Sequence, residues 1–207
     1  MFAITSKQMK KLDEEIVKKY NIPSILLMEN AASNVVKVLK SKIKIKNNNI
    51  LILVGKGNNG GYALAVGRIL FGLKAKIVFF IVDKDLKKMS KDCKIQFDII
   101  KKMKIPYFFD LKKLNKFFCH SNFIVIDGIL GTGFKNELNE KLKKILKEIN
   151  NLKCYKISID IPTGINSDNG KGDIYFKSNL IITFEYLKIA HILKDDIGDI
   201  FLKKNIL

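Results

Sequence analysis

The sequence predicts an α/β protein: a doubly wound, mostly parallel sheet with helices on both faces, preceded by two N-terminal helices. Short, uniformly apolar runs rich in β-branched residues alternate with longer segments of helical periodicity. Uniform apolarity is typical of parallel strands, because their crossover helices cover both faces of the sheet. A glycine-rich turn also follows the first apolar run and opens a helix, as in doubly wound folds.

Two amphipathic helices are expected within the first 48 residues. Thr5 or Ser6 is a suitable cap for the first, and Pro23 a suitable start for the second. Their apolar residues recur at helical spacing and predict one buried face on each helix. These residues are Met9, Leu12, Ile16 and Tyr20 in the first helix, and Leu26, Leu27, Ala31, Val35 and Leu39 in the second.

The remaining chain alternates between expected strands and helices. Strands are expected at residues 50–54, 76–82, 123–127 and 156–160, with a shorter one near Tyr107 and two late ones at 180–184 and 199–202. Helices are expected at residues 60–71, 86–104 and 136–149. This alternation predicts a Rossmann-like arrangement.

Length and composition predict a single domain over residues 1–207. The N-terminus lacks a signal-peptide core, and no apolar run approaches the ~20 residues that span a bilayer, so we expect a cytoplasmic protein without a membrane partner. Cys93, Cys119 and Cys154 are odd in number and far apart in sequence. They suggest neither a zinc site nor a disulfide framework.

The net charge of +18 comes almost entirely from lysine, since Arg68 is the single arginine. A nucleic-acid reader usually carries arginines for bidentate contacts and aromatic residues among the basic ones. Here the lysines are spread over nearly every expected helix. We therefore expect a solvated lysine surface, with an anionic partner such as nucleic acid as the alternative.

The segment at residues 55–61 (Gly-Lys-Gly-Asn-Asn-Gly-Gly) matches G-x-G-x-x-G between a strand and a helix. It could bind a phosphate, or simply turn the chain. A dehydrogenase could use Asp83 after the second strand, but its proton-relay residues are missing, and a P-loop would need lysine at Gly61. The amides of Asn58 and Asn59 favour cation or polar-ligand contacts.

Two further strands end in carboxylates followed by turns. Asp127 precedes Gly131-Thr132-Gly133-Phe134, and Asp160 precedes Ile-Pro-Thr163-Gly. The carboxyl ends of parallel strands share one edge of the sheet, so the three loops are expected to converge there. Asn58, Asn59, Asp127 and Thr163 offer hard oxygens suited to potassium, magnesium or calcium rather than zinc. Asp160 would then be free for acid/base work, although either aspartate could merely cap its turn.

Together these motifs resemble the NAD(P)H-hydrate epimerase family, also called the YjeF N-terminal domain. The similarity covers nearly the whole chain, and several ordered motifs are more specific than any one of them. The motifs are Ile4-Thr5, Leu12-Asp13, residues 22–24, residues 27–31, residues 57–61, residues 127–133, residues 160–164, and Thr183-Phe184 with Lys188.

The resemblance implies repair of nicotinamide nucleotides, with the enzyme interconverting the R and S epimers of hydrated NADH and NADPH (NADHX and NADPHX). It implies that Asp160 is catalytic, and that a potassium ion is held by Asn59, Asp127 and Thr163. The substrate-binding residues it implies are Asn58, Asn59, Gly60, Gly61, Tyr62, Gly131, Thr132, Gly133, Phe134, Lys135, Asn136, Glu137 and Asp160. A separate dehydratase normally consumes the S epimer. Oligomeric state stays open, with a homodimer as one option.

One departure concerns Tyr62, which stands where the family pattern has an aspartate. If the site works, the phenol should contact the ligand, whereas an abandoned site should be filled by the ring. The alternative function is a non-catalytic module of this fold that contacts RNA. An ordinary NAD-linked oxidoreductase is less favoured, because the expected proton-relay residues are missing.

Overall fold

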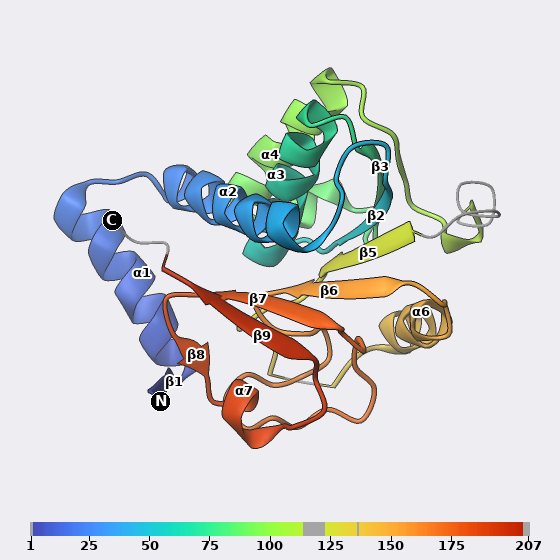
Figure 1. Cartoon of the computed structure of the whole chain (residues 1–207). Coiled ribbons are helices and arrows are strands. Elements are labelled where there is room, and N and C mark those ends of the chain that lie inside the picture. Colours follow the sequence, from blue (N-terminus) through green and yellow to red (C-terminus); the bar gives the residue numbers. More distant parts are fainter. Residues whose placement is uncertain (1, 114–122, 136, 205–207) are drawn as a thin grey trace.

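The computed structural model describes residues 2–113, 123–135 and 137–204. A seven-stranded sheet runs through this part of the chain in the order β4-β3-β2-β5-β6-β7-β9, and every neighbouring pair is parallel (Figure 1). The predicted fold class is confirmed. The strands are β2 (Asn49–Val54), β3 (Lys76–Ile81), β4 (Tyr107–Phe108), β5 (Phe123–Gly128), β6 (Tyr155–Ile159), β7 (Leu180–Phe184) and β9 (Asp199–Lys203).

Helices cover both faces of the sheet (Figure 1). One face carries α2 (Ser24–Lys42), α3 (Asn58–Gly72) and α4 (Lys91–Lys102), and the other carries α6 (Glu140–Asn150) and the short α7 (Ala190–Leu193). Along β2, Ile50 and Ile52 pack in the core on the α3 side, while Leu51 and Leu53 join the core on the α6 side. Burial on both faces explains why the strands are apolar without alternation. No helix in the described ranges is long and apolar enough to cross a bilayer.

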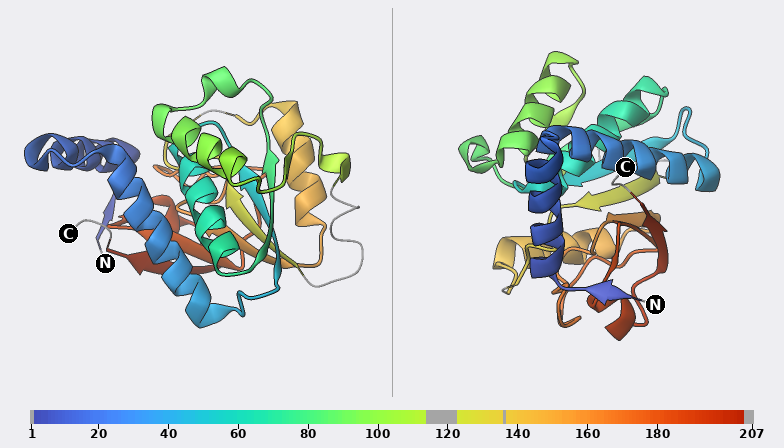
Figure 2. Two further views of the ribbon diagram at one scale, coloured as in Figure 1. Left: turned by 90° about the horizontal axis from the view of Figure 1, so that it is seen from above. Right: turned by 90° about the vertical axis from the view of Figure 1, so that its left-hand side faces the viewer.

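The first helix, α1 (Ser6–Tyr20), stands at one side of the layers and leads into α2 (Figure 2). Thr5 caps it as predicted: its hydroxyl accepts from the Gln8 amide at 3.2 Å, and the Gln8 side chain accepts from the Thr5 amide at 2.8 Å. Just before it, β1 (Ala3–Ile4) pairs in parallel with β8 (Leu187–Lys188). This pairing was not predicted, because two-residue strands are too short to show a period.

The order of the strands reverses between β2 and β5, and the loops after these strands pack backbone against backbone. The Gly55 amide donates to the Gly128 carbonyl at 3.2 Å. A Cβ atom on Gly55 would lie 1.9 Å from the Ile129 carbonyl oxygen, and one on Gly60 would lie 2.0 Å from that of Gly55. Glycine is therefore required at both positions for this close approach, which forms the switch point where ligands of such sheets bind.

Three sequence expectations differ from the structure. The helix expected at 86–104 is divided into η1 (Leu86–Lys88) and α4, because the Ser90 amide donates to the Lys56 carbonyl at 2.8 Å. The helix expected at 136–149 begins only at Glu140, after the Asn139 cap. Tyr20 and Leu26, expected on buried faces, are exposed beside the α1–α2 connection, which lies away from the sheet. A second short 3₁₀ turn, η2, spans Leu111–Lys113.

Candidate active site

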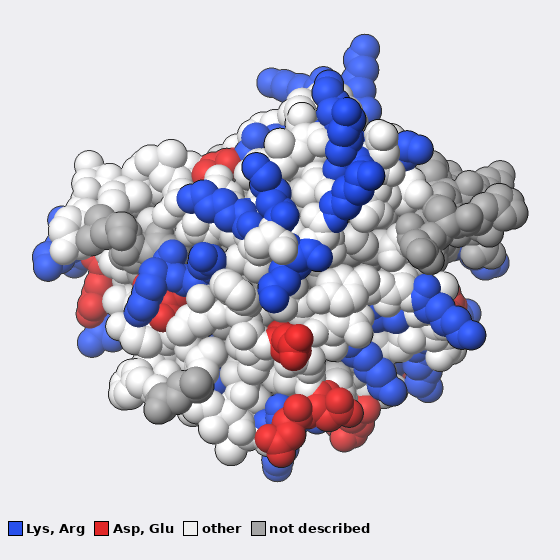
Figure 3. Space-filling view, in the orientation of Figure 1, with Lys and Arg blue, Asp and Glu red and all other residues white. Residues whose placement is uncertain are grey.

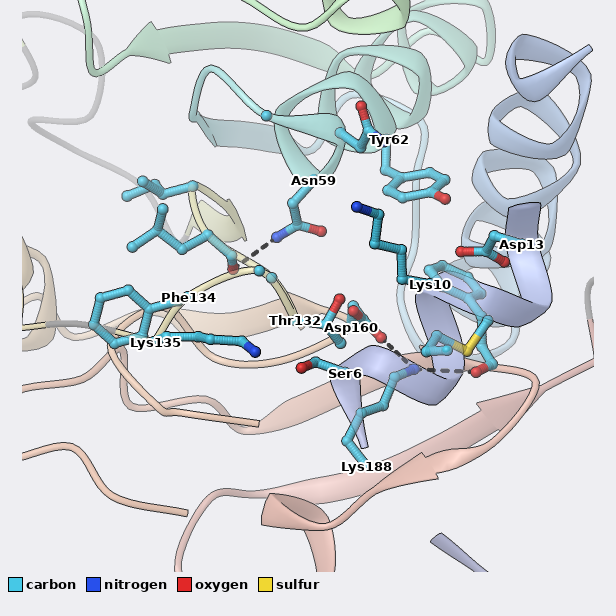
Figure 4. Close-up of a pocket in the computed structure, with 18 of the residues that line it drawn as sticks. Ser6, Lys10, Asp13, Asn59, Tyr62, Thr132, Phe134, Lys135, Asp160 and Lys188 are labelled. Atoms are coloured by element: carbon cyan, nitrogen blue, oxygen red, sulfur yellow. Dashed lines mark hydrogen bonds and ion pairs between the residues drawn. The ribbon is translucent and has the colours of Figure 1, made fainter. Parts of the chain in front are cut away.

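A cavity of about 1220 Å³ lies beyond the carboxyl ends of the strands. It is enclosed by α1, the start of α2, and the loops that follow β2, β5, β6 and β7 (Figure 4). Ten of the residues implied as substrate-binding line it: Asn58, Asn59, Tyr62, Gly131, Thr132, Gly133, Phe134, Lys135, Glu137 and Asp160. Its size suits a ligand larger than a single ring.

The remaining three implied substrate-binding residues are Gly60, Gly61 and Asn136. Gly60 and Gly61 do not line the cavity. They are buried in the first turn of α3, where a Cβ on Gly61 would lie 2.6 Å from the Met28 methyl group, so their shared role is close packing of the helix. Asn136 lies outside the described residues.

Asp160 follows β6 with a left-handed backbone (φ 70°). Its Oδ1 atom lies 2.5 Å from the Lys188 ammonium and accepts a hydrogen bond from the Thr183 hydroxyl at 3.0 Å (Figure 4). Burial by itself raises the pKa of Asp160, but the charge and hydrogen bond of Lys188 outweigh it, so the pKa is lowered. Asp160 is therefore ionised at neutral pH.

Lys188 is itself fully buried, and its three protons are all engaged. Besides Asp160, its ammonium donates to the Thr183 hydroxyl at 2.8 Å and the Phe184 carbonyl at 3.1 Å. A buried ammonium without such partners would be costly. The sequence showed Lys188 only as part of a motif and gave it no role, although a lysine at the end of an apolar segment was a usable signal.

His191 supports the backbone of Asp160. Its Nδ1 atom accepts from the Lys188 amide at 3.1 Å, so Nε2 carries the proton and donates to the Asp160 carbonyl at 3.0 Å. Burial lowers the pKa of His191 to about 4, which keeps the ring neutral. Sequence reasoning gave His191 no role, because nothing in its local sequence indicates a contact 31 residues away.

Asn59, Asp127 and Thr163 meet in one hydrogen-bond network. The Thr163 hydroxyl donates to Asp127 Oδ1 at 2.7 Å and accepts from the Leu130 amide at 2.9 Å. The Asn59 amide group donates to the Leu130 carbonyl at 2.9 Å, which leaves its Oδ1 atom buried without a hydrogen-bond partner. The three oxygen-bearing side chains implied as metal ligands are thus brought together by the fold.

Asp127 is completely buried, and four groups donate to its carboxylate. They are the amides of Ile129 and Thr163 and the hydroxyls of Ser158 and Thr163. Burial raises the pKa of Asp127 to about 6, even though these hydrogen bonds act to lower it. Among the described residues, no cluster of three histidine, cysteine or acidic side chains could hold a metal. Any ion here would therefore need the amide oxygen of Asn59 and the hydroxyl oxygen of Thr163 in addition to the Asp127 carboxylate.

Tyr62 lies along the cavity wall and does not close the cavity. Its ring packs on that of Phe184 at 5.6 Å between centroids, and its hydroxyl points toward the α1 wall near Asp13 (Figure 4). Burial, with the nearby charges of Asp13 and Asp160, raises the pKa of Tyr62 well above its usual range. The phenol is therefore neutral and available for a hydrogen bond.

Asp13 is a further carboxylate of the cavity, contributed by α1. Burial, followed by the negative charge of Asp160, raises its pKa to about 6. Within the described part of the chain, no hydrogen bond or ion pair engages its carboxylate. The sequence placed Asp13 in a motif without assigning it to the site, since its proximity to Asp160 depends on how α1 docks.

The chain is similar to known proteins of one family. The model of the family YjeF-related protein N-terminus matches residues 24–190. The NAD(P)H-hydrate epimerase of Nitrosopumilus maritimus is 32% identical over 181 residues, covering 86% of this chain and 83% of that protein. The bifunctional NAD(P)H-hydrate repair enzyme Nnr of Dictyoglomus turgidum is 41% identical over 179 residues, which are 83% of this chain; the chain spans only 33% of that enzyme.

A solved structure supports the fold. The crystal structure of the yeast protein ynu0 (YNL200c) superposes with a TM-score of 0.80 and covers 98% of this chain and 88% of that one, at 19% sequence identity. At this identity the likeness shows the fold alone. Because the family model covers most of the chain and the epimerase relatives align over most of their own length, the chain belongs to the NAD(P)H-hydrate epimerase family.

Proposed function

We propose that this protein interconverts the R and S epimers of hydrated NADH and NADPH, the reaction for which its relatives are named. The observation that supports this most directly is Asp160, an ionised carboxylate fixed at the wall of a cavity that is large enough for a nucleotide. Repair of a damaged cofactor needs no redox partner, which agrees with the missing proton-relay residues of a dehydrogenase.

The proposed reaction requires little covalent chemistry from the protein. The ring nitrogen of the hydrated nicotinamide can expel the neighbouring hydroxyl and leave a cationic ring, to which water adds again. A fixed carboxylate stabilises such a cation and exchanges protons with the hydroxyl or the water. Lys188 and Thr183 hold the Asp160 carboxylate in place, while His191 holds its backbone. The site thus stabilises charge at one position before the reaction begins.

The remainder of the substrate is expected to lie along residues 58–62 and 131–137. The first turn of α3 presents backbone amides and the positive end of the helix dipole, which favour phosphate. Lys135 extends from the opposite loop, within 3.9 Å of Asp168 and along the cavity (Figure 4). We infer that these groups bind the pyrophosphate, leaving the nicotinamide ring near Asp160.

A potassium ion fits the network of Asn59, Asp127 and Thr163. The unpartnered, buried Oδ1 atom of Asn59 is the observation that supports this, since such an atom needs a partner. A monovalent cation polarises weakly, so it would hold the first turn of α3, which carries Asn59, against the loop that carries Leu130 rather than act on the ring. We expect potassium to raise the melting temperature relative to the bulky choline ion, and Thr163→Val to remove that increase. Equal melting temperatures in both salts would contradict the assignment.

The test of the proposed activity uses mixed hydrate epimers with a dehydratase specific for the S form. Alone, the dehydratase should leave the R epimer, apart from slow uncatalysed epimerisation. When this protein is added, the R epimer should be consumed completely as well. The Dictyoglomus turgidum relative is named as a bifunctional repair enzyme, which favours a second repair activity, for which we propose a dehydratase, as the functional partner. If the R epimer disappears no faster with this protein than by uncatalysed epimerisation, the proposal is wrong.

The surface gives the RNA-binding alternative no specific support. Lysines are scattered over the face shown in Figure 3, and carboxylates gather along one edge of it. Arg68, the only arginine, is engaged in an ion pair with Glu29, which also accepts from Gln96 at 2.6 Å. The charge is thus suited to weak, nonspecific attraction rather than to base recognition.

A further inference from the structure

Two carboxylates from different walls face the same cavity. Asp160 follows β6 and lies on the sheet side, whereas Asp13 projects from the middle of α1 beside Lys10 and Tyr62 (Figure 4). The two groups are close enough for the charge of Asp160 to affect the titration of Asp13. The cavity therefore presents an acidic group on each of two walls.

The environments of Asp160 and Asp13 shift the pKa values of the two carboxyl groups in opposite directions. Asp160 is paired with Lys188 and hydrogen-bonded to Thr183, which favours the carboxylate. Asp13 has no such partner in the described ranges, and Glu14, Glu185 and Asp160 all add negative charge around it, opposed by Lys188. Pairs of titratable groups whose environments push their pKa values apart often divide the roles of acid and base.

Inversion of the ring carbon needs proton transfer on both faces. The hydroxyl leaves from one face of the ring as water, and a new water must arrive on the other face to give the opposite epimer. A single carboxylate fixed by Lys188 can serve only one face unless the ring turns over inside the cavity. A second acid/base group on the opposite wall removes that requirement.

We propose that Asp13 is the second catalytic acid/base residue and serves the ring face opposite Asp160; this inference rests on the proposed epimerase function. For one epimer, protonated Asp13 gives its proton to the hydroxyl oxygen while the C–O bond breaks and the ring nitrogen forms a C=N bond. Water leaves. A second water then attacks from the other face, forming the new C–O bond and passing a proton to Asp160. After the product leaves, Asp160 gives its proton to solvent and Asp13 takes one up, so the starting protonation state is restored and atoms and charge balance.

The test follows both inversion and oxygen exchange in water enriched in ¹⁸O, each measured above the enzyme-free rate. In the wild-type protein, every inversion should bring in one labelled oxygen. Asp13→Asn should lower inversion by ~10²–10⁴-fold, the usual contribution of an acid/base group. It should still exchange oxygen, without inversion, in the epimer whose hydroxyl faces Asp160. The control is Glu15→Gln on the exposed side of α1, which should match the wild type in both assays.

Three results would overturn either the role of Asp13 or the proposed epimerase function. Undiminished inversion in Asp13→Asn means that the residue is not needed. An equal loss of inversion and exchange in Asp13→Asn, with an unchanged circular dichroism spectrum and melting temperature, means that Asp13 only shapes the cavity. A wild-type protein inert in both assays would instead overturn the proposed function itself.

Discussion

Asp160 shows how much of the candidate site depends on one residue and its contacts. Its carboxylate forms the 2.5 Å ion pair that neutralises the buried Lys188. Removing one member of a buried ion pair leaves the other without compensation. Asp160 is consequently important for stability as well as for the proposed chemistry, which the sequence alone did not show.

Asp160→Asn should lower epimerisation by ~10²–10⁴-fold, since it removes a proton carrier while keeping the shape. It should also destabilise the fold by about 3–5 kcal/mol, because Lys188 loses its counter-charge. Steady-state kinetics and urea unfolding measure the two effects. The double variant Asp160→Asn with Lys188→Met should recover part of the stability but none of the activity. Wild-type turnover in the single variant would show that Asp160 is structural.

Tyr62→Asp restores the residue expected from the family pattern, but the structure predicts a loss. The aspartate would lie near Asp13, Asp92 and Asp160, whose charges already raise the pKa of the phenol. It would also lose the contact with Phe184. We expect lower activity and a lower melting temperature, whereas Tyr62→Phe should keep the ring packing and the stability. A large gain in activity in Tyr62→Asp would mean that the tyrosine weakens the natural enzyme.

At the scale of elements, α1 depends on a loop from the other end of the chain. Asp168 accepts from the Ser6 amide at 2.6 Å and the Ser6 hydroxyl at 2.7 Å, at the positive end of the helix. The neighbouring Ser167 hydroxyl donates to the Thr132 carbonyl at 3.3 Å. One short segment thus fixes both the helix that carries Asp13 and the loop proposed to bind the substrate.

Asp168→Ala should destabilise the protein by ~0.5–2 kcal/mol, as loss of a helix cap does, and raise KM more than it lowers kcat. Ser6→Ala should have a smaller effect, because the Ser6 amide remains bound to Asp168. If the two residues act through one contact, the double variant should be no worse than Asp168→Ala alone. Fully additive losses in thermal unfolding would contradict this coupling.

At the scale of the whole molecule, His191 links stability to pH. Its pKa in the folded protein is about 4, below the ordinary 6.5, so the unfolded chain takes up the proton first. The contribution of His191 to the free energy of unfolding is therefore present above pH 6.5 and is lost as the pH falls toward 4. Burial is the main cause. The Lys188 ammonium also lowers the pKa, and the Asp160 carboxylate opposes the shift.

His191→Gln, which cannot titrate, should be less stable than the wild type at pH 7.5, and the difference should shrink as the pH falls below 6.5. Urea unfolding of both proteins between pH 7.5 and 4.5 measures this. Asp13 and Asp127, whose pKa values are raised to about 6, make the folded protein more stable as the pH falls. Both residues are present in the wild type and the variant, so their effects cancel in the comparison. A difference that stays constant with pH would contradict the neutral, buried ring.

The sequence by itself determined the parallel sheet, most of the strands and helices, and the convergence of three loops. These follow from local signals: uniform apolarity in strands such as Ile50–Val54, helical spacing, and glycines where backbones must touch. It could not determine the environment of Asp160. The partners Lys188 and His191 lie 28 and 31 positions away, and Asp13 lines the cavity because α1 docks there, next to the β1–β8 pair and held by Asp168. Such contacts arise from docking between distant segments, which leaves no periodic pattern in the chain, and they decide which carboxylates share a cavity and which of them is charged.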